Sequence, residues 1–215
     1  MCEMKQKIVV MGGSFNPPTT AHLRLMHAAV DGIGAQMGIF TPTNHAYVKI
    51  KMRRAKHPDE VYSEDVRRDM LLAMCRDDTR LMVDDVEYYR EGGRNYETME
   101  YLQQKYPDAE LYFVLGGDKL NVFPRWHRGR EFMENFKLLI FKRNGIDPES
   151  QIMENERMRE YRDSFVILPE PEGVEDISST RVRAEAIRGG NVEGLVHEGV
   201  ARLMREHPLG MKEGK

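Results

Sequence analysis

Apolar residues follow two different spacings along the chain. In one of them they stand side by side in short runs rich in β-branched residues, which predicts β-strands. These runs cover residues 8–11, 37–41, 81–83, 111–115, 138–141 and 165–168. Most are continuously apolar, as is typical of parallel strands that are buried on both faces of a sheet.

Between these runs, apolar residues recur every three or four positions, which predicts helices with one buried face. The positions with this spacing are His22, Leu25, Met26, Ala29, Val30 and Ile33, then Val66, Met70 and Ala73, and later Val182 and Ala186. Gly189 and Gly190 are expected to cap the last of these helices. The alternation predicts an α/β fold, a Rossmann-like doubly wound parallel sheet with helices on both faces.

The length of 215 residues fits a single domain over residues 1–215. A charged segment at residues 143–162 is expected to be a surface insertion with a helix, and residues 208–215 a frayed tail. Ligands of doubly wound sheets bind beyond the carboxyl ends of the strands. Motifs that directly follow a predicted strand are therefore the first candidates for a binding site.

Charge and cysteine content narrow the functional classes. A net charge of −3 and a pI near 6.2 give no reason to expect nucleic acid or a membrane as a partner, and no apolar stretch approaches the ~20 residues that span a bilayer. The two cysteines, Cys2 and Cys75, have no metal-binding spacing, which favours a reducing, cytoplasmic location. Basic residues gather at 49–56 and 125–130, where they either form a solvated surface or attract a polyphosphate.

The segment GSFNPPTTAH, residues 13–22, follows the first strand and opens a helix. Backbone amides at a helix start are unpaired donors with partial positive charge, and Gly12 and Gly13 let a ligand oxygen approach the backbone. His22 is in phase with the buried face of the helix, so its imidazole is expected to project inward, where it can stabilise phosphate charge as a cation or as a hydrogen-bond donor. This pattern predicts a phosphate site.

A second candidate lies near the other end of the chain, in ISSTRVR at residues 177–183. Hydroxyl and guanidinium groups there surround another helix start, where Ser179 and Thr180 are expected to cap the helix. We expect the fold to bring the two segments together around one triphosphate. GxGxxG is absent after the first strand and GxxxxGK[ST] is absent altogether, which disfavours an NAD-dependent dehydrogenase and a P-loop kinase or ATPase.

The segment GSFNPP with TTAH resembles the signature of the nucleotidylyltransferase superfamily, G-x-F-(D/N)-P followed by (H/T)-x-G-H. Residues 115–128, LGGDKLNVFPRWHR, resemble the G-(A/G)-D…W segment of nicotinate and nicotinamide mononucleotide adenylyltransferases. ISSTRVR is similar to their ISST-x-(I/V)-R, and HAYVKIK at residues 45–51 to their lysine-bearing loop after the second strand. Two positions depart from the pattern, with Thr19 in place of the first His and Ala21 in place of Gly.

The resemblance implies that AMP is transferred from ATP to a pyridine mononucleotide, giving a dinucleotide and pyrophosphate in NAD biosynthesis. It assigns catalysis to His22 and mononucleotide binding to Phe15, Lys49 and Trp126. It assigns ATP and phosphate binding to Gly13, Ser14, Thr19, Gly116, Asp118, Ser179, Thr180 and Arg183. Mg²⁺ is expected to arrive with ATP, so no protein ligand for a metal is named.

Four of these residues also have a purely structural interpretation. His22 could cap or pack, Phe15 could pack at the strand end, Asp118 could be an N-cap, and Trp126 could belong to the core. Lys51 competes with Lys49 for the phosphate contact.

Three questions stay open on the sequence. The activity could instead be that of another superfamily enzyme, such as a pantetheine-phosphate adenylyltransferase or a cytidylyltransferase, or the chain could be a non-catalytic nucleotide sensor. The linker before ISST and residues 87–95 are candidates for choosing between nicotinate and nicotinamide. A homo-oligomer is compatible with the resemblance, but no apolar stripe demands one.

Overall fold

The computed structural model describes residues 5–90, 94–142 and 147–209, and the chain divides into two compact units. The first unit comprises residues 1–12, 26–39 and 94–171, and the second comprises residues 13–25, 40–93 and 172–215. The single domain expected from the length stays a prediction. None of the helices in the described ranges has both the length and the apolar character needed to cross a bilayer.

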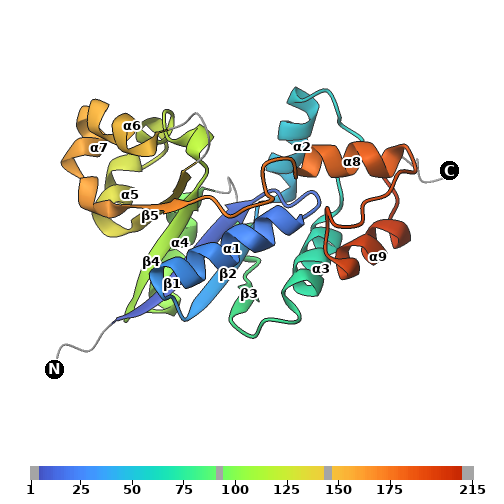
Figure 1. Ribbon diagram of the computed structural model, residues 1–215, viewed down its shortest axis with the longest axis horizontal. Helices are drawn as coiled ribbons and strands as arrows, with labels where there is room; N and C mark the ends of the chain where they lie inside the picture. The colour runs from blue at the N-terminus through green and yellow to red at the C-terminus, as the bar shows by residue number, and fades with distance from the viewer. Residues whose placement is uncertain (1–4, 91–93, 143–146, 210–215) are drawn as a thin grey trace. The chain divides into compact units, whose positions relative to one another are not determined.

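All six predicted strands are confirmed. They form one sheet in the order β3-β2-β1-β4-β5-β6, the order of a doubly wound fold. Their bounds are β1 Gln6–Gly13, β2 Met37–Pro42, β3 Leu81–Val83, β4 Ala109–Leu115, β5 Lys137–Lys142 and β6 Phe165–Pro169. β4 pairs in parallel with β1 and β5, and β5 pairs in parallel with β6 (Figure 1). The expected α/β architecture is therefore present.

The core of the first unit forms on the apolar runs of its strands. Ile8, Val10, Leu138 and Ile140 have no exposed surface, as expected of strands covered on both faces. Phe113 and Phe132 pack edge to face with ring centroids 5.3 Å apart. The helices of this unit are α4 (Asn95–Lys105), α5 (Gly129–Asn135), α6 (Pro148–Glu154) and α7 (Glu156–Glu160), with short 3₁₀ turns η2 (Gly117–Lys119), η3 (Phe123–Arg125) and η4 (Arg162–Ser164).

The segment predicted as a surface insertion is only partly at the surface. Residues 147–162 hold two helices, α6 and α7, where one was expected. Ile152 and Met158 from these helices are buried in the core, because each short helix turns one apolar residue inward. Residues 143–146 of this segment and residues 210–215 of the predicted tail lie outside the described residues.

Helix α1 (Thr20–Ile33) confirms the first helical spacing, since Met26, Ala29 and Val30 are completely buried. Its first six residues belong to the second unit and the remainder to the first. The second unit also contains α2 (His45–Arg54), α3 (Glu64–Cys75), the 3₁₀ turn η1 (Val86–Tyr89), α8 (Ser179–Ile187) and α9 (Glu198–Glu206). α3 and α9 pack closely, and a Cβ atom added at Gly199 would lie 2.9 Å from Cβ of Ala73.

Two local expectations are corrected in the second unit. HAYVKIK, expected as a loop, forms the first turns of α2, because Oδ1 of Asn44 caps this helix by accepting from the Ala46 N–H at 2.8 Å. The capping hydroxyl of α8 is that of Ser178, which accepts from the Arg181 N–H at 3.2 Å, while Ser179 and Thr180 are the first helical residues. The expected end of α8 is confirmed, since Gly189 has a φ of 70° that favours glycine.

Candidate phosphate-binding site

The loop after β1, residues 13–19, contains the central part of the site. Phe15 has a φ of 41° and a buried ring, which packs edge to face against His22 and Phe40 with centroids 5.1 and 5.5 Å away. The ring also lies over Gly13, where a Cβ atom would be 3.0 Å from Cζ of Phe15. The phenyl ring therefore has the packing role, and only the backbone of Phe15 is left to meet a ligand.

The backbone carbonyls of this loop are bound by the protein. The Gly13 oxygen accepts from the Thr43 N–H at 2.8 Å, and the Ser14 oxygen accepts from Nη1 of Arg67 at 2.7 Å. No hydrogen-bond partner is found for the N–H groups of Ser14 and Phe15 within the described ranges. A planar peptide directs its N–H opposite to its C=O, so these two amides point away from the groups that hold the carbonyls. Adjacent free amides of this kind suit an anionic oxygen.

The two distant segments of the chain meet as expected. Oγ of Ser179 donates to the Pro17 oxygen at 2.8 Å, and Nη1 of Arg183 donates to the Asn16 oxygen at 2.8 Å. Arg183 is almost completely buried, and its Nε also donates to Oε2 of Glu60 at 3.2 Å. These contacts hold the loop, whereas the ATP contacts expected of Ser179, Thr180 and Arg183 stay predictions.

Asn16 and Glu60 are site residues that the sequence reasoning missed. Asn16 is buried, its Nδ2 donates to the Glu60 oxygen at 2.7 Å, and its Oδ1 accepts from the Tyr62 N–H at 2.9 Å. The motif contains Asn16, which could have been noticed. Glu60 also contacts His57 three residues earlier, but its partners in the site, Asn16 and Arg183, lie 44 and 123 positions away, so no local signal marks it as a site residue.

The start of α1 differs from the expectation of free amides. The Thr20 N–H donates to the Leu195 oxygen at 2.9 Å, and the Thr19 N–H donates to Nδ1 of His22 at 3.0 Å. The expectation is wrong for these two residues, because the chain after α8 returns to Thr20 and the imidazole folds back on Thr19. The loop before the helix contributes available donors through Ser14 and Phe15.

His22 is oriented through Nδ1. Because Nδ1 accepts the Thr19 N–H, its lone pair is used there, and we assign the proton of the neutral ring to Nε2. Oγ1 of Thr19 lies 2.8 Å from the same nitrogen. Thr19, which replaces the usual His, thus fixes the tautomer of His22. In the described chain Nε2 has no partner, so its N–H is available to a ligand.

Burial and the nearby positive charge of Lys51 lower the pKa of His22 from 6.5 to about 4. The imidazole of the ligand-free protein is therefore neutral at pH 7. Of the two roles left open by the sequence, this favours a neutral hydrogen-bond donor over a cation.

Lys51 lies beside the loop, with Nζ 3.1 Å from Oγ of Ser14. Lys49, the lysine favoured by the motif, is exposed on the same helix, and no hydrogen bond or ion pair joins it to the loop in the part of the chain described. Two residues of an α-helix differ by about 200° in direction, so the two lysines leave α2 on different sides. The structure thus places Lys51, and not Lys49, beside the loop.

Gly116, Asp118 and Trp126 belong to the first unit. A Cβ atom at Gly116 would lie 2.7 Å from Oδ1 of Asp118, so the glycine makes room for this carboxylate. Asp118 is exposed and paired with Lys119 at 2.8 Å, and it does not cap a helix, because Gly116 holds the N-cap position of η2. Their binding roles stay predictions.

Trp126 is half-buried, and its ring packs edge to face against Phe123 and Phe113 with centroids 5.4 and 6.5 Å away. This bears out its packing role, and stacking on a pyridine ring stays a prediction.

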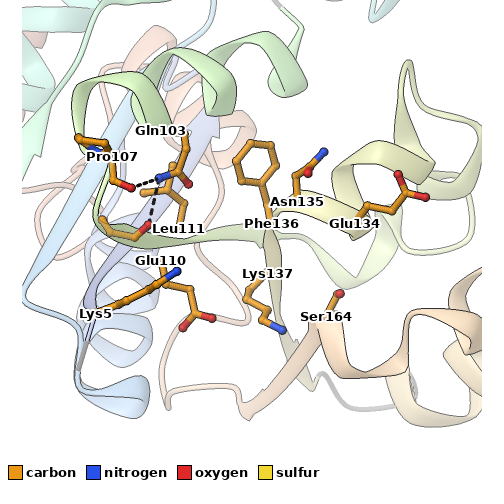
Figure 2. A pocket seen from close by; sticks show the side chains of 11 residues that line it. Lys5, Gln103, Pro107, Glu110, Leu111, Glu134, Asn135, Phe136, Lys137 and Ser164 are labelled. Carbon is orange, nitrogen blue, oxygen red and sulfur yellow. Dashed lines mark hydrogen bonds between the residues drawn. The ribbon is translucent and has the colours of Figure 1, made fainter. Parts of the chain in front are cut away.

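A cavity of about 340 Å³ lies elsewhere in the first unit, at the amino ends of β4 and β5 (Figure 2). It is lined by polar side chains that include Lys5, Gln103 and Lys137, and Gln103 is fixed by donating to the Pro107 and Ala109 oxygens. None of the predicted site residues lines it. Across the described ranges, no three His, Cys, Asp or Glu side chains are grouped so that they could hold a metal ion.

Comparison with known proteins gives concordant matches. A family model described as cytidylyltransferase-like matches residues 10–185. A "Probable nicotinate-nucleotide adenylyltransferase" of Dehalococcoides mccartyi is 32% identical over 206 residues, which are 94% of this chain and 96% of the relative. A protein of the same name from Lactiplantibacillus plantarum is 30% identical over 209 residues, 95% of this chain and 88% of the relative.

Solved structures show the same fold at lower identity. The nicotinic acid mononucleotide adenylyltransferase of Plasmodium falciparum in complex with NaAD superposes with a TM-score of 0.70 at 15% identity, covering 94% of this chain and 96% of that one. The same enzyme in complex with APC gives a TM-score of 0.71 at 15% identity. A Vibrio parahaemolyticus structure gives 0.64 at 18% identity, with coverage of 94% and 93%.

Proposed function

The chain belongs to the cytidylyltransferase-like family and shares it with proteins named nicotinate-nucleotide adenylyltransferases, and from this premise we propose that it transfers AMP from ATP to nicotinate mononucleotide. A phosphate oxygen of the mononucleotide attacks the α-phosphorus of ATP. The bond from this phosphorus to the oxygen that bridges to the β-phosphate breaks, and pyrophosphate leaves. The product is the dinucleotide deamido-NAD, or NAD if nicotinamide mononucleotide is the acceptor.

One arrangement carries this proposal: two backbone amides and a neutral imidazole N–H, all without a partner among the described residues, occur in one short segment whose Gly13 and Ser14 carbonyls are held by the protein. Both substrates are anionic, so catalysis depends mainly on positioning and on neutralising charge. The N–H groups of Ser14 and Phe15 donate to phosphate oxygens. Nε2–H of His22 donates to an oxygen of the α-phosphate, where charge changes during the transfer.

Lys51 supplies the positive charge of the site. Its ammonium group lies at Ser14 and interacts with His22 through space. A cation at this position offsets the charge of the incoming phosphates and adds to the effect of burial in lowering the pKa of His22. Lys49, Thr180 and Arg183 are retained as further contacts for ATP or the mononucleotide.

The metal ion of the reaction belongs to the substrate. ATP reacts as its Mg²⁺ complex, and Mg²⁺ takes its ligands from phosphates and water where the protein offers few carboxylates. The donor chemistry of the described residues fits this role, since it supplies amide, imidazole and ammonium groups for phosphate and no clustered carboxylates for a metal. The cytoplasmic location expected from the cysteine content is part of this proposal.

Pyrophosphate release tests the function. The purified chain is incubated with MgATP and, in separate reactions, nicotinate mononucleotide, nicotinamide mononucleotide or 4′-phosphopantetheine. We expect release with a pyridine mononucleotide and none with 4′-phosphopantetheine. Turnover only with 4′-phosphopantetheine would assign the chain to another branch of the superfamily, and ATP binding without any release would make it a nucleotide sensor.

A further inference from the structure

Arg67 is the largest fully buried side chain among the described residues, and it belongs neither to the sequence motifs nor to the groups assigned to the proposed reaction. It lies in the first turn of α3. Its guanidinium group donates from Nη1 to the Ser14 oxygen at 2.7 Å and from Nη2 to the Thr43 oxygen at 2.8 Å. One buried cation therefore joins the loop after β1 to the segment after β2.

Those two segments are also joined directly, because the Thr43 N–H donates to the Gly13 oxygen at 2.8 Å. Arg67 thus closes a short cycle of hydrogen bonds through Gly13, Ser14 and Thr43. Every member of this cycle except Arg67 is a backbone group. A change at Arg67 is consequently the way to open the cycle without altering the loop sequence.

The contact with Ser14 determines the direction of a catalytic donor. The Ser14–Phe15 peptide is planar, so fixing its oxygen toward Arg67 aims the Phe15 N–H the opposite way. Phe15 is a non-glycine residue at a φ of 41°, a conformation that a free loop rarely adopts. The loop therefore needs an external restraint to keep this amide directed at a ligand.

We propose that Arg67 is a positioning residue for phosphate transfer, which aims the Phe15 N–H at the reacting phosphate by holding the Ser14 carbonyl. This inference rests on the proposed function. Arg67 itself does not touch the substrate. It acts on the reaction by orienting the Phe15 N–H, which must point at the phosphate in the transition state.

Arginine is required because the contact is forked. Two nitrogen atoms of one planar group reach two carbonyls, whereas the single ammonium of a lysine cannot reproduce that geometry. Burial lowers the pKa of Arg67, and Tyr88, whose ring lies 5.4 Å from the guanidinium carbon, opposes this shift together with Glu64 and Glu87. These neighbours make it possible to bury the cation.

The test compares Arg67→Lys with Arg68→Lys. Arg68 is the next residue of α3 and is surface-accessible, with ion pairs to Asp65, Asp69 and Asp85, so it controls for loss of an arginine from this helix. Both variants are checked by thermal melting, and kcat and KM for both substrates are measured by pyrophosphate release. For Arg67→Lys we expect a kcat lower by about 10²-fold with KM changed only a few-fold, and for Arg68→Lys kinetics within about twofold of wild type.

A second variant separates positioning from folding. In Arg67→Ala, added guanidinium ion at low millimolar concentration is expected to restore part of kcat, which would not follow if the residue only stabilised the fold. Equal kcat in wild type and Arg67→Lys, a rise in KM alone, or the failure of both variants to fold would overturn the proposal. If the wild type itself releases no pyrophosphate, the proposed function fails and this role of Arg67 fails with it.

Discussion

His22 has one ring nitrogen bound to the backbone and the other without a partner among the described residues. This arrangement follows from Thr19, which is completely buried and supplies both the N–H and the hydroxyl near Nδ1. The sequence places an imidazole near a helix start, and the contact with Thr19 determines which nitrogen can act. Two predictions belong to this residue.

Replacing His22 by Ala is expected to lower kcat by about 10²-fold with a smaller effect on ATP binding, because a donor that acts on developing charge contributes on that scale. Steady-state pyrophosphate release measures this change. His207→Ala is the control, since it removes an exposed imidazole at the end of α9. Unchanged turnover in His22→Ala would exclude the residue from the mechanism.

The pKa of His22 also predicts how stability depends on pH. The pKa is about 4 in the folded protein and 6.5 in the unfolded chain, so between these values the unfolded chain binds more protons. The contribution of neutral His22 to the free energy of unfolding is complete above pH 6.5 and is lost as the pH falls toward 4. We expect the free energy of unfolding, measured with urea between pH 7 and 4.5, to fall more steeply with decreasing pH in wild type than in His22→Asn. Parallel profiles would contradict the assigned pKa.

At the level of elements, α2 determines which lysine serves the site. Lys49 and Lys51 differ by two positions, and the helix directs only Lys51 to Ser14 in the described contacts. Both lysines would be equally available if this segment were the loop that its motif indicates. The helical conformation of this segment, which Asn44 caps at its start, therefore decides between them.

Lys51→Met is expected to reduce kcat/KM for ATP by about tenfold, in the range found for a charge that contacts phosphate. The same change should raise the pKa of His22, because the charge that helps to lower it is removed. NMR titration of the histidine ring signals measures that shift. Lys49→Met is the matched control, and a larger loss of activity there than in Lys51→Met would favour the motif over the structure.

For the whole molecule, the loop after β1 is held by residues from distant parts of the chain. Arg67 of α3 and both Ser179 and Arg183 of α8 bind three of its carbonyls, and all of these groups lie in the second unit. The Asn16 and Pro17 carbonyls precede prolines and share no peptide with an N–H, so of these three contacts only that of Arg67 with the Ser14 oxygen directs a free amide, that of Phe15.

Chelation of divalent ions should stop turnover and leave the ligand-free protein equally stable. The reason is the proposed route, in which Mg²⁺ enters as part of the ATP complex and is not held by the protein alone. Pyrophosphate release with and without EDTA, together with thermal melting without ATP, tests both parts. A lower melting temperature in EDTA would reveal a resident metal.

Much of the fold could be predicted from the sequence because its signals are local. Six apolar runs became six strands, and the spacing from His22 to Ile33 became α1. The meeting of residues 13–22 with 177–183 was also predicted, since both follow a family pattern. Glu60 and Arg67 could not be found in this way, because neither lies in a motif and both act through contacts with residues far along the chain.

Spacing and composition act between near neighbours, so the strands, the principal helices and the kinds of side chain near the loop after β1 follow from local patterns in the chain. The tertiary fold settles which groups are used within the protein and which are left for a ligand. It directed the Thr20 amide to Leu195 and Arg183 to Asn16 and Glu60, and it kept the Ser14 and Phe15 amides available. A backbone donor is free only when folding supplies it with no partner, and that is a property of the complete arrangement.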